Sequence, residues 1–147
     1  MPDTYTTDYL QVIFDPTQFL DTIKLAAKSI KAWNKKQPLG FEAIAFTGVS
    51  GAALAFPLAA KLNVPLLCVR KPKESTHSFY PVEGYLAAER YIIVDDFIDY
   101  GDTINFIVRA ISEQSTATFA KCIGIYQYAS CGGYSDVAPL IKPNYML

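Results

Sequence analysis

Two adjacent carboxylates, Asp95 and Asp96, directly follow an apolar run and are the clearest chemical signal in the chain. A short loop with Gly101 and Thr103 comes next, after which apolar residues recur at helical spacing. The loop therefore lies between a strand's carboxyl end and a helix's amino end, where exposed N–H groups and the helix dipole favour an anion. Because carboxylates beside it can reach hydroxyl groups or a hydrated metal ion, the segment predicts a site for a sugar phosphate.

The same loop also has a purely structural interpretation. Asp99, Asp102 and Thr103 are ordinary capping residues, so they could serve only to start the helix. However, two adjacent aspartates after an apolar strand would be costly if buried without partners. We therefore favour a cleft that holds a cation or hydroxyl groups near Asp95 and Asp96.

Length and composition indicate one domain, residues 1–147. The chain is 51% hydrophobic, enough for one well-filled core. A net charge of −1 gives no broad basic surface, so we expect no nucleic-acid partner. Cys68, Cys122 and Cys131 lack metal-ligand spacing and fit a reduced compartment. With no apolar leader or membrane-spanning run, we expect a soluble, cytoplasmic protein with no membrane partner.

The periodicity along the chain alternates between helix and strand. Asp15 and Pro16 begin a helix whose apolar face ends at Trp33. Residues 129–147 are expected to form an irregular segment that covers part of the domain. The other expected elements are a strand at 41–47, a turn at 48–51, a helix at 52–62, a strand at 66–70, the strand before the acid pair, a helix at 103–114 and a strand at 119–128.

This alternation predicts an α/β fold with a doubly wound, mainly parallel central sheet. Both glycine-bearing turns, 48–51 and 99–103, then fall on the carboxyl edge of the strands, where such sheets bind ligands. Neither turn has the GxGxxG spacing of a dinucleotide site, and the position of the acid pair along the chain does not fit a phosphoacceptor receiver domain.

Two segments resemble type I phosphoribosyltransferases. Residues 91–103 resemble the signature that binds phosphoribosyl pyrophosphate (PRPP), and they depart from it at Tyr100. Residues 47–71 resemble the family's pyrophosphate loop with its following helix and strand. The resemblance implies the family's fold, with a small variable hood built from the terminal segments. The signature is matched at Asp95, Asp96, Phe97, Ile98, Gly101 and Thr103.

The resemblance also implies residue roles. Asp95 and Asp96 would contact the ribose hydroxyls, directly or through Mg²⁺ and its waters, without being direct metal ligands. The 5-phosphate would bind at Asp99, Tyr100, Gly101, Asp102 and Thr103. The pyrophosphate would bind at Thr47, Gly48, Val49, Ser50, Gly51, Arg70 and Lys71.

Residues 70–84 resemble the family's flexible catalytic loop, and their basic residues resemble those of the orotate branch. Lys73 and His77, with Mg²⁺, would neutralise charge on the departing pyrophosphate. Asp99 stands where 6-oxopurine enzymes carry an aspartate that exchanges a proton with the base, which makes it a candidate general base. The loop could equally be a solvated surface segment, and Asp99 a helix cap.

The implied activity is Mg²⁺-dependent transfer of the ribose 5-phosphate of PRPP to a nucleobase, with release of pyrophosphate. Asp99 points to a purine and hence to salvage, whereas the lid resembles the orotate type. Tyr100 favours an alternative, a PRPP- or nucleotide-binding regulator without turnover. Tyrosines in residues 5–14 and from Tyr126 onward could stack on the base or merely pack. Family members are commonly dimers, so a homodimer is expected.

Overall fold

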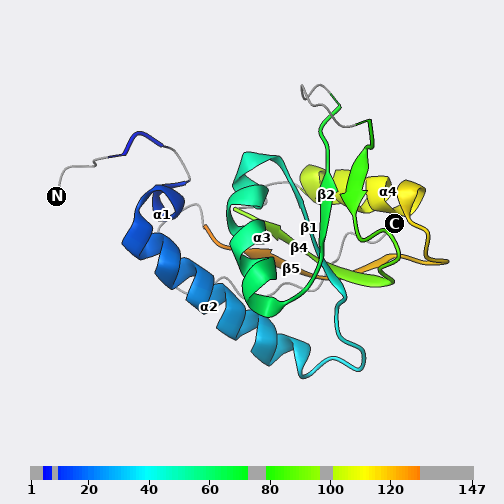
Figure 1. Ribbon diagram of the computed structural model, residues 1–147, viewed down its shortest axis with the longest axis horizontal. Coiled ribbons are helices and arrows are strands. Elements are labelled where there is room, and N and C mark those ends of the chain that lie inside the picture. Colours follow the sequence, from blue (N-terminus) through cyan, green and yellow to red (C-terminus); the bar gives the residue numbers. More distant parts are fainter. Residues whose placement is uncertain (1–4, 8–9, 73–78, 97–100, 130–147) are drawn as a thin grey trace.

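The computed structural model describes residues 5–7, 10–72, 79–96 and 101–129, which form one layered α/β unit (Figure 1). Within these residues the helices are α1 (Gln11–Phe14), α2 (Pro16–Asn34), α3 (Gly48–Leu62) and α4 (Asp102–Gln114). The strands are β1 (Ala43–Thr47), β2 (Leu66–Val69), β3 (Val82–Gly84), β4 (Arg90–Asp95) and β5 (Lys121–Gln127).

The strands form one sheet in the order β3-β2-β1-β4-β5. All neighbours are parallel except β2 and β3, which confirms the predicted doubly wound, mainly parallel sheet. The chain leaves β1 through α3 on one face and leaves β4 through α4 on the other. The strand order therefore reverses between β1 and β4, and in open α/β sheets ligands bind at the carboxyl end of such a switch point.

Each face of the sheet has its own apolar core because side chains alternate along the strands. Ala43 and Ala45 of β1 face α4, whereas Ile44 and Phe46 face α2 and α3. Trp33 of α2 packs against the second core, as its helical spacing predicted. Its ring lies where a Cβ on Gly124 of β5 would come within 2.9 Å, so only glycine fits there.

Two local predictions were wrong. The helix expected from Ala52 begins at Gly48, because the positive φ of 67° at that glycine turns the chain within one residue. Residues 48–51 are therefore the first turn of α3 rather than a separate loop. The segment at 70–84, expected as a loop, contains the short antiparallel strand β3. The amino-terminal segment proposed for the hood contains α1, which is compatible with that proposal.

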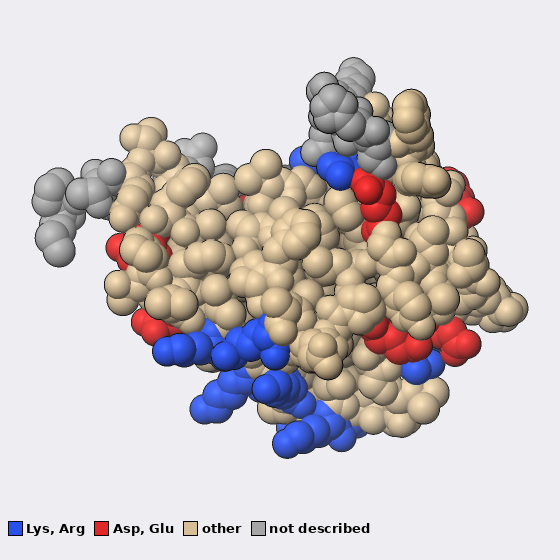
Figure 2. Space-filling model, in the orientation of Figure 1, with Lys and Arg blue, Asp and Glu red and all other residues tan. Residues whose placement is uncertain are grey.

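Charge is distributed unevenly despite the near-zero net value. Figure 2 shows basic side chains gathered at the lower side over α2, away from the upper end where α3 begins in Figure 1. They include the exposed lysines at positions 24, 28, 31, 35 and 36. These α2 lysines are therefore not placed to contact an anion at the sheet edge where α3 begins (Figure 1 and Figure 2). Among the described residues, none of the helices has the length and apolar character that crossing a bilayer requires.

Candidate active site

Asp95 ends β4 at the switch point and is almost fully buried, with 5% of its surface exposed. Its Oδ1 accepts hydrogen bonds from the backbone N–H of Asp96 at 2.9 Å and from the Ser50 hydroxyl at 3.3 Å. Burial and then the neighbouring Asp96 carboxyl raise the pKa of Asp95 to about 7. The half-buried Asp96 lies beside it. The acid pair is thus tied to the start of α3 across the β1–β4 boundary.

The start of α3 is packed closely against the sheet. The Thr47 hydroxyl donates to the Val69 carbonyl at 2.7 Å, which joins the ends of β1 and β2 and leaves no side-chain cap on α3. A Cβ on Gly51 would lie 3.1 Å from Phe46 Cβ and 3.3 Å from the Val94 carbonyl oxygen. Gly51 is therefore a site of close helix-to-sheet packing. The pyrophosphate contact predicted for its backbone stays a prediction.

Gly48, Val49 and Ser50 form the outer part of this turn. Val49 is 77% exposed, so its side chain packs against little of the protein. Gly48 keeps a positive φ, and a Cβ there would come within 2.9 Å of the Lys71 ammonium nitrogen. The predicted lysine and the predicted glycine turn are therefore neighbours, and a cation lies over the amino end of α3.

The start of α4 is more open. Gly101 is its N-cap, with a φ of 79°, and no side chain caps the helix among the described residues. Asp102 and Thr103 are both exposed. The capping roles considered for these two side chains are therefore not realised, and the N–H groups of the first turn have no side-chain partner there. Such a turn can accept an anion.

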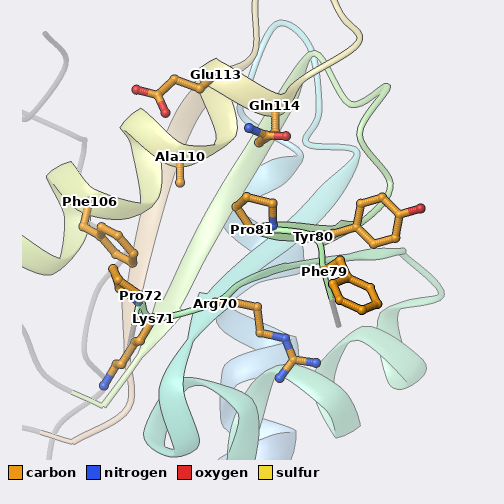
Figure 3. A pocket seen from close by; sticks show the side chains of 10 residues that line it. All are labelled: Arg70, Lys71, Pro72, Phe79, Tyr80, Pro81, Phe106, Ala110, Glu113 and Gln114. Carbon is orange, nitrogen blue, oxygen red and sulfur yellow. The ribbon is translucent and has the colours of Figure 1, made fainter. Parts of the chain in front are cut away.

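Both ends of the predicted lid line one hollow beside α4. Arg70 forms an ion pair with Glu83 of β3, with 2.8 Å between Nε and Oε1. Figure 3 shows Arg70 and Lys71 pointing in different directions at the rim of a hollow of about 560 Å³. Its lining combines both ends of the lid segment with one side of α4, namely Arg70, Lys71, Pro72, Phe79, Tyr80, Pro81, Phe106, Ala110, Glu113 and Gln114.

Four predicted residues, Lys73, His77, Asp99 and Tyr100, lie outside the described residues. Two of the tyrosines considered for base stacking have contacts within the protein. Tyr126 is 2% exposed and belongs to the core beside α2. Tyr128 donates its hydroxyl proton to the Ser50 carbonyl.

The Tyr128 contact was missed by sequence reasoning. Burial and then the charges of Asp96 and Asp95 raise the pKa of Tyr128, which places its phenol beside the acid pair. Its position in the sequence could have indicated this contact, because Tyr128 directly follows β5, which ends on the same edge of the sheet as Asp95.

The oxygen donors suit a magnesium ion that is held mostly by a substrate. No cluster of three or more histidine, cysteine, aspartate or glutamate side chains occurs in the described part of the chain. Asp95 and Asp96 supply carboxylate oxygens at one place, and Mg²⁺ in phosphate-transfer sites commonly uses one or two carboxylates plus water and substrate phosphates. The arrangement therefore fits a metal that arrives with a phosphate ligand.

Comparison with known proteins places this geometry in a family context. No protein-family model matches the chain. A curated relative, the orotate phosphoribosyltransferase of Pyrococcus abyssi, is 24% identical over 123 residues, or 83% of this chain. The matched region spans 63% of that relative's length.

Solved structures show the same fold. The adenine phosphoribosyltransferase of Thermoanaerobacter pseudethanolicus superposes with a TM-score of 0.60 at 23% identity, covering 83% of this chain and 74% of that one. The Mycobacterium tuberculosis orotate phosphoribosyltransferase in complex with PRPP gives a TM-score of 0.60 at 12% identity, covering 82% and 65%. The chain is thus similar in sequence to phosphoribosyltransferases and has the type I phosphoribosyltransferase fold.

Proposed function

We propose that the chain is a phosphoribosyltransferase, which transfers the ribose 5-phosphate of PRPP to a nucleobase and releases pyrophosphate. One observation carries the proposal. The buried Asp95 and its neighbour Asp96 stand at the switch point between two helix starts, each of which has a glycine with positive φ. Carboxylates flanked by two anion-accepting turns match a ribose with a phosphate at each end.

Each part of PRPP has a counterpart in this arrangement. Asp96, with Asp95 behind it, would face the ribose hydroxyls, and the backbone of residues 101–103 would hold the 5-phosphate. The first turn of α3 would hold the pyrophosphate, and its backbone at Gly48 lies beside the Lys71 ammonium group. A cation at this place would stabilise negative charge as it gathers on the leaving pyrophosphate.

Magnesium belongs to the proposal as a partner of the substrate. When bound, the ion would neutralise phosphate charge and orient the pyrophosphate. Asp95 and Asp96 would hold it through its waters. Asp95 is already engaged with Ser50 and with the Asp96 N–H, so Asp96 has the more accessible carboxylate.

The remaining catalytic roles stay predictions from the sequence. Lys73 and His77 would close over the pyrophosphate from the lid, and Asp99 would exchange a proton with the base. A closed lid would also exclude water from a carbocation-like transition state. These three residues are the first targets for substitution once activity is measured.

The identity of the base is the finer part of the proposal. Asp99 supports a purine, and a fold neighbour is an adenine phosphoribosyltransferase. The curated relative is an orotate phosphoribosyltransferase, which supports a pyrimidine. We keep a purine as the proposed substrate class, with orotate as the competing outcome of the same assay.

The test is an assay that measures release of pyrophosphate from PRPP in the presence of Mg²⁺. One base is supplied at a time: hypoxanthine, guanine, xanthine, adenine, uracil or orotate. We expect turnover with at least one base and a loss of at least about 100-fold in kcat/KM for Asp96→Asn, because a charged contact to the substrate is removed. Asp21→Asn, on the exposed face of α2, is the matched control.

Two other results would change the conclusion. PRPP binding by calorimetry without turnover on any base would support the regulatory alternative. If the chain shows neither PRPP binding nor turnover, the proposed function is wrong.

A further inference from the structure

The end of β5 joins the two halves of the proposed site. The Tyr128 hydroxyl donates to the carbonyl of Ser50 in the first turn of α3. The backbone N–H of Tyr128 donates to the Asp95 carbonyl at 3.2 Å, and that of Ala129 donates to the Asp96 carbonyl at 2.8 Å. Residues 128–129 are therefore bonded to both the acid pair and the turn predicted to hold pyrophosphate.

The chemistry of the phenol limits what Tyr128 can do. A tyrosine hydroxyl has one proton to donate, and here the Ser50 carbonyl receives it. The side chain is half-buried. With its proton engaged inside the protein, this hydroxyl is arranged to hold the turn rather than to donate to a substrate.

The first turn of α3 has few other attachments to the acid pair. The Thr47 hydroxyl is directed to β2, so it does not cap the helix. The Ser50 hydroxyl reaches Asp95 at 3.3 Å, which is long for an O–H···O bond. The bond from the Tyr128 hydroxyl to the Ser50 carbonyl is thus a second side-chain link between this turn and the neighbouring strand ends.

We propose that Tyr128 is a positioning residue that fixes the first turn of α3 relative to Asp95, so that its backbone N–H groups are set for pyrophosphate. The inference rests on the proposed function for its ligand. Pyrophosphate is held by the turn both before and after bond cleavage, so loss of the link should weaken binding in both states. It should raise KM for PRPP and leave kcat nearly unchanged.

The experiment compares Tyr128→Phe with Tyr91→Phe. Both substitutions remove one buried hydroxyl, but Tyr91 lies at the other end of β4 and its hydroxyl has no hydrogen-bond partner among the described residues. Calorimetry measures the binding affinity for inorganic pyrophosphate and, separately, for ribose 5-phosphate, each in the presence of Mg²⁺. We expect Tyr128→Phe to weaken pyrophosphate binding about fivefold to tenfold, the loss typical of one hydrogen bond, and to leave ribose 5-phosphate binding unchanged. Tyr91→Phe should change neither.

Backbone order parameters from ¹⁵N relaxation give a readout that needs no ligand. Tyr128→Phe should lower them at residues 48–51 and leave them unchanged at 101–103. Unchanged order parameters and unchanged pyrophosphate affinity would overturn the positioning role alone. Equal weakening of both ligands would also overturn it, because that pattern indicates a general loss of structure. If the unsubstituted chain binds neither ligand, the proposed function fails, and the positioning role for pyrophosphate fails with it.

Discussion

The two helix starts at the carboxyl edge of the sheet share one backbone feature, a glycine with positive φ, and differ in the contacts around it. Each has a glycine with positive φ after a parallel strand, Gly48 before the rest of α3 and Gly101 before α4. The α3 start is held by bonds to Asp95 and from Tyr128. The α4 start has exposed polar residues at its first two positions and no side-chain cap in the described part of the chain.

Under the proposed function, this difference would let a single edge bind two phosphates in different ways. A turn that is bonded to neighbouring strands is pre-organised, so little ordering is needed when its ligand binds. A turn with uncapped N–H groups gains its missing partners only from the ligand or water. The predictions below test whether the α3 start is the fixed half of the site and the α4 start the open half.

The largest expected effect comes from the carboxyl that anchors α3. The pKa of Asp95 is raised by burial from an ordinary 3.8 to about 7. The folded chain therefore holds this proton more tightly than the unfolded chain. The resulting stability is complete below about pH 3.8 and is lost as the pH rises through 7. Relative to Asp95→Asn, the unfolding free energy should fall by an amount on the order of 3 kcal/mol between pH 4 and pH 8.

Urea unfolding across this pH range measures that difference. The asparagine keeps an oxygen that can accept from Ser50 and from the Asp96 N–H, so the fold should survive. The contributions of other titrating groups to the pH dependence cancel in this difference, because both proteins contain those groups. Parallel stability curves would show that Asp95 is already ionised in the folded chain.

A second change would displace the fixed helix start. Gly51→Val adds a branched side chain where even a Cβ would lie 3.1 Å from Phe46 Cβ. Overpacking should lower the unfolding free energy by about 2 kcal/mol and weaken pyrophosphate binding. Ala60→Val, on the exposed side of the same helix, is the control and should cost less than about 1 kcal/mol. Equal losses in the two variants would contradict close packing at Gly51.

The open helix start is tested by Gly101→Ala. Its φ of 79° is unfavourable for a residue with a Cβ, so we expect a loss of about 1 kcal/mol in unfolding free energy. Binding of ribose 5-phosphate should weaken while binding of pyrophosphate is retained, the reverse of the pattern expected for Tyr128→Phe. Calorimetry with both ligands decides this, and unchanged ribose 5-phosphate affinity would contradict the assignment of the α4 start.

The smallest effect concerns a tyrosine outside the site. Tyr91 is fully buried and its hydroxyl has no hydrogen-bond partner among the described residues. Removing an unsatisfied polar group should leave the unfolding free energy unchanged or raise it by up to about 1 kcal/mol. Thermal unfolding of Tyr91→Phe measures this. A clear decrease would show that the hydroxyl has a partner in the native chain.

Much of the fold could be predicted from local patterns. The strand before the acid pair, the helix at 103–114 and the parallel units follow from runs of apolar residues at strand or helix spacing, and the structure confirms them. The start of α3 could not be placed because the turn depends on one dihedral angle at Gly48, whereas the residue types also suit a longer loop. The three-residue β3 is too short for a periodic signal.

The site could be predicted only where residues are close along the chain. Asp95 and Asp96 sit at the edge that the pattern indicated, and the first turns of α3 and α4 open toward the same edge. The bond from Tyr128 to Ser50 joins residues 78 positions apart, and no periodic signal reports such a contact. The likeness to phosphoribosyltransferases supports the proposed ligand class. The side-chain links that shape this particular turn became visible only in the folded chain.

The most direct test of the central claim is a crystal structure of the chain with PRPP and Mg²⁺. The account predicts the ribose hydroxyls beside Asp96, the 5-phosphate on the N–H groups of residues 101–103 and the pyrophosphate on the first turn of α3. PRPP bound in the hollow beside α4, or no PRPP at the carboxyl ends of β1 and β4 at saturating concentration, would contradict it.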